Sequence, residues 1–286
     1  MPELPEVEVL VRHLSPLLTG RRILGVTVRK PRLVRPDAPA EFAAHLQGTV
    51  VEAVGRRGKY LWFSLSSRVG VLSLTGHLGM TGRMYLVPAG RQPPRHAAVI
   101  FDLGGEEWVF EDVRGFGRMT LDPGVVSGLG PEPLEAGFTE AVLWEALKGS
   151  RQAVKVRLLD QSVVAGVGNI YASEALFRAR ISPRRRAGAL GSGEVGRLRD
   201  AVVEVLEEAI RLGSALPLDF AGDSGVGGSG EEGLFYYGRM PGGGSSAEER
   251  FRVYDRSGLP CVACGTSIRR ILQAARSTYF CPRCQR

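Results

Sequence analysis

Lysine is scarce in this sequence of 286 residues, where only Lys30, Lys59, Lys148 and Lys155 occur among 37 cationic side chains. This scarcity narrows the search for an amine nucleophile. Long apolar runs are also missing, because none approaches the roughly 20 residues that span a bilayer. The start lacks the basic, apolar and small-residue order of a secretory signal. We therefore expect a cytoplasmic protein without membrane segments.

The charge balance is basic, with 37 Lys and Arg against 30 Asp and Glu and a formal net charge of +7. The isoelectric point of the sequence is near 9.5. Such a balance favours a polyanionic partner, with nucleic acid first. A generic basic enzyme is an equally good explanation of net charge alone.

The N-terminal half predicts a helix followed by strands. Apolar residues recur at three- and four-residue spacing from Pro5 to Leu18, which indicates an amphipathic helix that Gly20 ends. Residues 23–121 mostly have strand-like patterns, and a hairpin is expected through Gly104 and Gly105. These patterns predict an antiparallel sandwich or barrel-like layer capped by the first helix.

After residue 121 the composition of the chain changes from strand-like to turn-rich and helical segments, and then to glycine- and serine-rich stretches. A turn-rich stretch at 122–137 predicts a linker, and glycine- and serine-rich stretches at 221–233 and 241–249 predict mobile loops. Between them lie four segments with helical periodicity: 139–149, 151–165, 170–180 and 194–212.

All four cysteines lie near the C-terminus in two Cys-x-x-Cys pairs, Cys261 with Cys264 and Cys281 with Cys284. Two such knuckles can complete a tetrahedron around one Zn²⁺, and four protein ligands make that site structural. A redox pair or two disulfides fit this spacing less well. The residues between the knuckles predict a β-hairpin.

The zinc module is strongly cationic. Residues 251–286 carry seven arginines against a single acidic residue, Asp255. A positive hairpin on a rigid metal knuckle suits the phosphate backbone or a groove of nucleic acid. The alternative is a zinc module that only stabilises the fold of the C-terminus.

Residues 158–181 contain two apolar helical segments separated by Gly166-Val167-Gly168. Asn169 stands where the N-cap of the second helix is expected. The free N–H groups and the dipole of a helix start favour an anion, so a phosphate could bind there. A simple capping role is the alternative for Asn169.

Three stretches together resemble the formamidopyrimidine-DNA glycosylase family, which are bacterial enzymes that excise oxidised purines. They are MPELPEVE at the start, LLDQSVVAGVGNIYASEALF in the middle, and VYDRSGLPCVACG with RSTYFCPRCQ at the end. The resemblance runs along the whole chain. It implies an α+β multi-domain protein made of an N-terminal antiparallel β-sandwich with a leading helix, a helix-two-turn-helix domain and a C-terminal zinc-finger hairpin. The expected domains are residues 1–125, 126–235 and 236–286.

The resemblance turns the N-terminus into the expected active site. Removal of Met1 would leave Pro2 with a free secondary amine that attacks the sugar C1′ and forms an iminium. Glu3 would act as acid and base during sugar-ring opening, and Glu6 would position the amine or the sugar. The alternative for Glu3 and Glu6 is that they merely favour the positive start of the helix.

Further residues carry over one by one from the family. The resemblance implies that Lys59, assigned to a strand, acts beside the lesion phosphate and that Lys155 lies near the damaged nucleotide. It also implies phosphate contacts from Asn169 and Arg276, and a position near DNA for His77, for which a structural role is the alternative.

The family flips its target base out of the duplex, and three residues match those that fill the hole: Met80, Arg114 and Phe116. A flexible Met and a flat Phe can wedge a base step, while Arg hydrogen-bonds the orphaned base. The chain departs from the family at Gly115, where a second arginine is usual, and at RHAAV, which keeps only His96 of a His-Asp-His-type start. The glycine-rich region before the zinc finger is extended.

We therefore expect a bifunctional DNA glycosylase and AP lyase with one structural Zn²⁺. Its expected partner is damaged double-stranded DNA, and its expected setting is the bacterial nucleoid, where it acts as a monomer. Two alternatives stay open: an endonuclease VIII-like enzyme for oxidised pyrimidines or abasic sites, and a non-catalytic DNA-binding relative.

Overall fold

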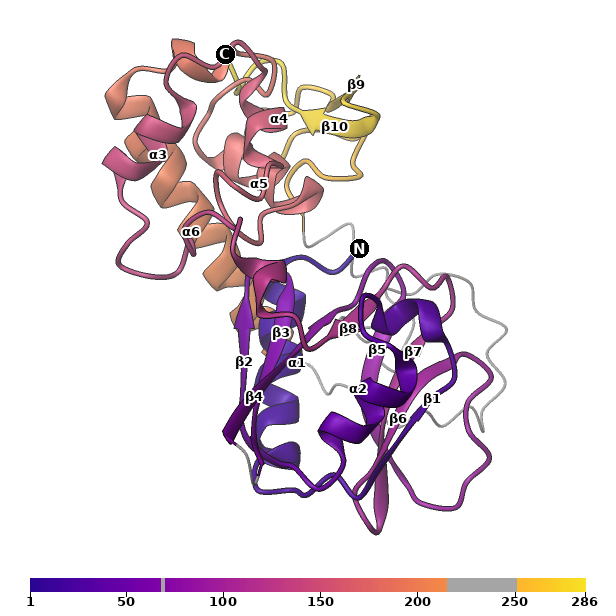
Figure 1. The fold of residues 1–286 in the computed structure, drawn as a ribbon. Coiled ribbons are helices and arrows are strands. Elements are labelled where there is room, and N and C mark those ends of the chain that lie inside the picture. Colours follow the sequence, from indigo (N-terminus) through magenta and orange to yellow (C-terminus); the bar gives the residue numbers. More distant parts are fainter. Residues whose placement is uncertain (68–69, 215–250) are drawn as a thin grey trace. The chain divides into compact units, whose positions relative to one another are not determined.

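The computed structural model describes residues 1–67, 70–214 and 251–286, which form two compact units (Figure 1). Residues 1–127 belong to the first unit, and residues 128–212 with the described C-terminal residues belong to the second. Within the described residues, no helix has the length and apolar character needed to cross a membrane. The expected loops at 221–233 and 241–249 and the expected boundary near 235 lie outside the described residues. The division into three domains stays a prediction.

The first unit begins with helix α1 (Leu4–Leu18), as the periodicity predicts. Its stripe of Val7, Leu10, Leu14 and Leu18 is fully buried in the core of the unit. Pro5 lies in the first turn, where its missing N–H costs no hydrogen bond. Gly20 follows the helix with φ +83°, a conformation that favours glycine.

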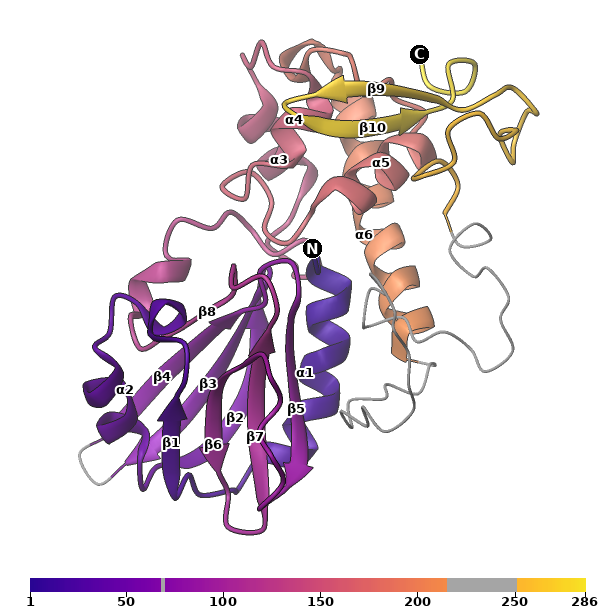
Figure 2. The same ribbon diagram turned by 90° about the vertical axis from the view of Figure 1, so that its right-hand side faces the viewer.

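Two antiparallel four-stranded sheets pack face to face, and α1 lies along one side of them (Figure 2). Phe63 of one sheet and Trp108 of the other have ring centroids 4.7 Å apart, which places aromatic packing between the layers. The predicted β-sandwich is thereby confirmed. The first sheet has the order β1 (Gly25–Val28), β6 (Ala97–Asp102), β7 (Glu106–Asp112), β5 (Gly82–Pro88). The second has the order β2 (Val50–Arg57), β3 (Tyr60–Ser67), β4 (Gly70–His77), β8 (Arg118–Thr120).

The predicted hairpin is present: Gly104 and Gly105 lie in the turn that joins β6 to β7. The strand-like interpretation of 23–121 missed one helix, α2 (Pro39–Leu46), and a short 3-10 helix, η1 (Pro31–Val34). Phe42 and Leu46, one helical turn apart, are fully buried in the core. This short apolar pair is too brief a signal for periodicity to separate helix from strand.

The second unit contains four α-helices among its described residues: α3 (Glu140–Leu147), α4 (Val154–Leu158), α5 (Asn169–Arg178) and α6 (Ser192–Ser214). Two 3-10 helices also occur, η2 (Pro123–Val126) in the first unit and η3 (Ala187–Ala189) in the second. The helix expected over 151–165 ends early because side chains compete for the backbone. Asp160 accepts hydrogen bonds from the N–H and hydroxyl of Ser162, and Gln161 binds the 159 and 167 carbonyls.

The C-terminal hairpin is also present as predicted. Strands β9 (Arg269–Gln273) and β10 (Arg276–Phe280) pair antiparallel and are joined by Ala274 and Ala275. Both alanines have positive φ, 46° and 59°, as a tight hairpin turn of this kind requires.

Candidate active site and nucleic-acid interface

The start of α1 is a buried, carboxylate-rich segment. Pro2 is buried, and Glu3 and Glu6 are only 3% and 2% exposed. The backbone N–H of Glu3 donates to Oε2 of Glu6 at 2.7 Å. Glu6 therefore fixes the peptide that directly follows Pro2. This contact serves both interpretations of Glu6, since a carboxylate in the first turn also complements the helix dipole.

Lys59 lies in the tight turn between β2 and β3, so its assignment to a strand was wrong by one residue. The turn is tied to α1 by a chain of polar contacts. Arg56 donates to Glu8 Oε2 at 3.0 Å and to the Gly58 carbonyl at 3.2 Å. Burial raises the pKa of Glu8, but the hydrogen bonds from Arg12 and Arg56 outweigh it and hold the pKa below its ordinary value. This network links the turn of Lys59, which is 7% exposed, to the helix that follows Pro2.

His77, at the end of β4, is held as a neutral imidazole. Burial, followed by the charges of Lys59 and Arg118, lowers its pKa from 6.5 to about 4. Its ring lies 4.7 Å from the ring of Tyr60, and its Nδ1 accepts the N–H of Gly79 at 3.1 Å. An imidazole that accepts at Nδ1 carries its proton on Nε2. His77 is therefore a hydrogen-bond donor of the kind that a phosphate oxygen accepts.

The three proposed hole-filling residues lie on two loops that touch. Met80 is 42% exposed and Phe116 is 60% exposed, and the guanidinium of Arg114 lies 5.0 Å from the centre of the Phe116 ring. A Cβ on Gly79 would come within 2.5 Å of the Phe116 backbone. The two loops thus approach each other so closely that only glycine fits, and the structure brings the loop of Met80 against the loop of Arg114 and Phe116.

In the second unit, Lys155 is fully buried and donates three hydrogen bonds. Its Nζ reaches Asn169 Oδ1 at 2.6 Å, Thr278 Oγ1 at 2.7 Å and the Ser277 carbonyl at 3.0 Å. Because an ammonium group only donates, it must face the amide oxygen of Asn169, which leaves the amide N–H₂ to donate elsewhere. Lys155 thereby orients Asn169 and ties it to the zinc hairpin.

The interpretation of Asn169 as an N-cap was wrong by one position. Gly168 is the N-cap of α5, and Asn169 is the first helical residue. Its side chain is therefore not used to cap the helix but is bound by Lys155. The positive end of the helix dipole at this helix start still favours an anion.

The four cysteines form a zinc site. Their sulfur atoms all lie within 4.8 Å of one another, with Cys264 and Cys281 at 3.5 Å and Cys261 and Cys284 at 3.9 Å. A tetrahedral Zn²⁺ with Zn–S bonds of about 2.3 Å requires sulfurs roughly 3.8 Å apart, so the residues fit one structural zinc.

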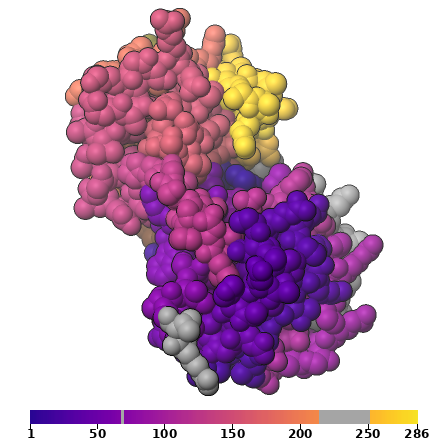
Figure 3. Space-filling view, viewed as in Figure 1, coloured from indigo at the N-terminus to yellow at the C-terminus, as the bar shows by residue number. Residues whose placement is uncertain are grey.

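The hairpin between the two knuckles is a surface feature of its unit. Its residues, yellow in Figure 3, lie on the outside, and Arg276 is exposed at the start of β10. Arg276 directly follows the turn residues Ala274 and Ala275, which both have positive φ.

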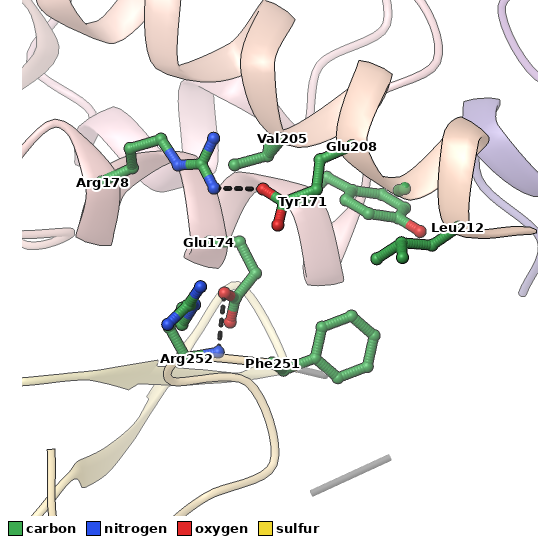
Figure 4. A pocket seen from close by; sticks show the side chains of 9 residues that line it. Tyr171, Glu174, Arg178, Val205, Glu208, Leu212, Phe251 and Arg252 are labelled. Atoms are coloured by element: carbon green, nitrogen blue, oxygen red, sulfur yellow. Dashed lines mark hydrogen bonds and ion pairs between the residues drawn. The ribbon is translucent and has the colours of Figure 1, made fainter. Parts of the chain in front are cut away.

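Sequence reasoning missed Glu174, which anchors the zinc module to α5 (Figure 4). Its buried carboxylate accepts the backbone N–H groups of Arg252, Val253 and Tyr254 at 2.8–3.0 Å. Burial raises its pKa in spite of these hydrogen bonds. Its only signal in the sequence is that it is the single acidic residue of the helical stretch 169–178.

Comparisons with known proteins agree with this geometry. Three family models match: the formamidopyrimidine-DNA glycosylase N-terminal domain at residues 1–119, the H2TH domain of that enzyme at 129–217, and the zinc finger found in FPG and IleRS at 258–286. Two curated formamidopyrimidine-DNA glycosylases match all of this chain. The one from Symbiobacterium thermophilum is 43% identical, with 89% of its length covered, and the one from Aromatoleum aromaticum is 42% identical over its full length.

Solved structures match over the full length as well. MutM in complex with DNA that contains carbocyclic 8-oxo-G has a TM-score of 0.84 at 30% identity, with both chains fully covered. A mutant FPG from Lactococcus lactis in complex with DNA that contains Fapy-dG has a TM-score of 0.83 at 32% identity, again with both chains fully covered. The family models, the curated relatives and the fold agree, so this chain belongs to the formamidopyrimidine-DNA glycosylase family.

Proposed function

We propose that this protein is a bifunctional DNA glycosylase and AP lyase that removes oxidised purines, such as 8-oxoguanine and formamidopyrimidines, from duplex DNA. The observation that carries the proposal is the start of α1, where Pro2 and Glu3 are buried and Glu6 holds the intervening backbone at 2.7 Å. Burial of the Glu3 and Glu6 carboxylates costs free energy that a purely structural segment would avoid.

The chemistry follows from the amine. Without Met1, the Pro2 nitrogen attacks C1′ of the damaged nucleotide, and the base leaves with the electron pair of the glycosidic bond and takes up a proton. The Pro2 nitrogen then loses its proton, and the C1′–O4′ bond breaks as the sugar ring opens, with O4′ taking up a proton. The iminium that remains between Pro2 and C1′ is an electron sink, so successive β- and δ-elimination expel the two flanking phosphates. Glu3 supplies and accepts protons during sugar-ring opening. An α-amino group has a pKa of about 7.7–8.0, so roughly a tenth is neutral at pH 7.

Both units supply groups that suit binding to DNA. In the first unit, Lys59 and the donor Nε2 of His77 are assigned to the phosphates and sugars near the lesion. In the second, Asn169 and Arg276 are assigned to phosphates, with Lys155 behind them as the group that orients Asn169. Zinc holds the hairpin that carries Arg276 and takes no part in the chemistry.

Purines are the favoured substrates because relatives are described with such lesions. MutM was solved with carbocyclic 8-oxo-G, and an L. lactis FPG variant with Fapy-dG. Wild-type L. lactis Fpg was also solved with DNA that contains an oxidised pyrimidine. Excision of oxidised pyrimidines is therefore a second candidate activity, and rates on both lesion classes opposite each base decide between them.

We also infer the setting of the protein. The curated relatives come from bacteria, which supports work in the bacterial cytoplasm on the nucleoid. A monomer is expected, because each unit has its own buried core. Sedimentation at micromolar concentration with and without lesion duplex tests this state, and a dimer in both conditions would contradict it.

The decisive test is a borohydride trap. The full-length protein is incubated with an 8-oxoguanine:cytosine duplex and borohydride, and the adduct is located by mass spectrometry. We expect a covalent adduct on the peptide that begins with Pro2. The matched variant Glu3→Gln keeps the shape of the site and should excise the base far more slowly. No adduct, or an adduct on lysine, would reject the mechanism.

A further inference from the structure

Asp112, the last residue of β7, is a fully buried carboxylate to which no role has been assigned so far. Its Oδ1 accepts the Thr81 hydroxyl at 2.6 Å and the Arg114 N–H at 3.1 Å, and its Oδ2 accepts the Gly117 N–H at 2.7 Å. All three donors are neutral. Burying a carboxylate against neutral donors is expensive, so a purely structural position would be served more cheaply by an uncharged residue.

The donors belong to the two loops that carry the exposed side chains Met80, Arg114 and Phe116. Thr81 follows Met80, and the Arg114 and Gly117 amides enclose Phe116. The Thr81 hydroxyl also accepts the Arg114 N–H at 3.1 Å, so one hydroxyl and one carboxylate join both loops. Neither loop can move relative to the other without breaking a hydrogen bond inside the protein.

Two cations brace the second loop from the side of η1. Lys30 donates to the Asp112 carbonyl at 2.6 Å, and Arg32 donates to the Arg114 carbonyl at 3.3 Å. A Cβ at position 115 would lie only 1.8 Å from a guanidinium nitrogen of Arg32, so Arg32 fits there only because residue 115 is glycine. The loop backbone is thus fixed at both carbonyls and amides, while the side chains that it presents remain exposed.

We propose that Asp112 is a positioning residue that holds Met80, Arg114 and Phe116 as one preformed wedge for insertion into the duplex. The proposal rests on the proposed function, in which these side chains fill the hole left by the flipped base. A wedge that is already ordered does not have to lose conformational entropy when it enters the base stack. Asp112 touches neither substrate nor reacting atoms and acts through the loops.

Three variants test the role. Asp112→Asn places an amide N–H₂ against a donor, and Thr81→Val removes the shared hydroxyl with little change of shape, whereas Thr81→Ser keeps it. We expect single-turnover excision of 8-oxoguanine to slow by about 10- to 100-fold in the first two, and to stay near wild type in Thr81→Ser.

The matched control is Asp37→Asn, since Asp37 also accepts a threonine hydroxyl and a backbone N–H, from Thr120 and Leu121. It should lower the melting temperature without a comparable loss of excision. A 2-aminopurine beside the lesion reports unstacking by the wedge, and its fluorescence change should slow in Asp112→Asn and in Thr81→Val.

A double-mutant cycle with Phe116→Ala tests whether Asp112 acts through the wedge. If Asp112 acts through the wedge, Asp112→Asn and Thr81→Val slow excision much less in the Phe116→Ala background than in the native one. Equal slowing in both backgrounds, or no slowing by either variant, overturns the role of Asp112. The proposed function is untouched by that result as long as the wild-type protein excises the base. A wild-type protein that excises nothing would instead reject the proposed function.

Discussion

Neutral His77 makes the stability of the first unit rise with pH in the mildly acidic range. Its pKa is about 4 in the folded protein against 6.5 when it is unperturbed. Between these values the unfolded chain binds more protons than the folded one, so stability rises with pH. The contribution is fully present above pH 6.5 and is lost as pH falls toward 4. A difference of about 2.5 units corresponds to roughly 3 kcal/mol at most.

The assay is equilibrium unfolding in urea from pH 5 to 7.5, with tryptophan fluorescence as the probe. Trp62 and Trp108 lie in the first unit and Trp144 in the second, so the Trp144→Phe protein reports on the first unit alone. In that background we compare His77 with His77→Gln, which keeps an acceptor and a donor but does not titrate. The native histidine should lose about 2 kcal/mol more between pH 7 and pH 5.

Two features make the result interpretable. The charges that act on His77 come from Lys59 and Arg118, and neither is a carboxylate that titrates in this range. Glu8, whose pKa is lowered, loses its contribution only below its ordinary value of 4.5, outside the range of the assay. Parallel pH curves for the two proteins would refute the reasoning, and so would a steeper curve for His77→Gln.

Four further predictions concern DNA binding and the second unit. Lys155→Met should destabilise the second unit by about 3 kcal/mol in thermal unfolding, because three acceptors lose a charged donor. It should also weaken DNA binding, because Asn169 is no longer oriented. Unchanged affinity for DNA would make Lys155 purely structural. Arg276→Ala should lower the slope of log affinity against log salt by about 1 for every duplex, since a phosphate contact reads no sequence. Removal of zinc by a chelator should abolish duplex binding, measured by anisotropy and restored by added Zn²⁺. Arg114→Ala should relax the preference for cytosine opposite the lesion, measured as excision rates opposite all four bases.

The parts of the fold that sequence predicts are those with short-range causes. Helix α1 follows from a periodic stripe with Pro5 and Gly20 at its ends, and the β6–β7 hairpin follows from Gly104 and Gly105 between two apolar runs. The zinc site follows from spacing, because a knuckle is set by four consecutive residues. In each case the local pattern and the tertiary packing agree.

The parts that sequence could not predict depend on partners far apart in the chain. Thr81 and Asp112 are 31 residues apart, and Lys155 and Thr278 are 123 apart, yet each pair is joined by a hydrogen bond of 2.6–2.7 Å. Nothing in the neighbourhood of a buried polar residue indicates which distant donor or acceptor satisfies it. Burial of a lysine or aspartate can be argued from function, but its partner requires the fold.

The scarcity of lysine can now be used as an argument about the nucleophile. Lys155 is fully buried with three acceptors, Lys30 is bound to the Asp112 carbonyl, and Lys148 forms an exposed ion pair with Glu145. Lys59 is the one whose turn is tied to α1, through Arg56, and it is only 7% exposed. An ammonium with an ordinary pKa near 10.4 is protonated at pH 7, whereas an α-amino group is partly neutral. If the borohydride adduct is found on residue 2 in Lys59→Arg as well as in wild type, the amine is that of Pro2 and the lysine acts on the phosphate. A wild-type adduct located on Lys59 would instead make that lysine the nucleophile.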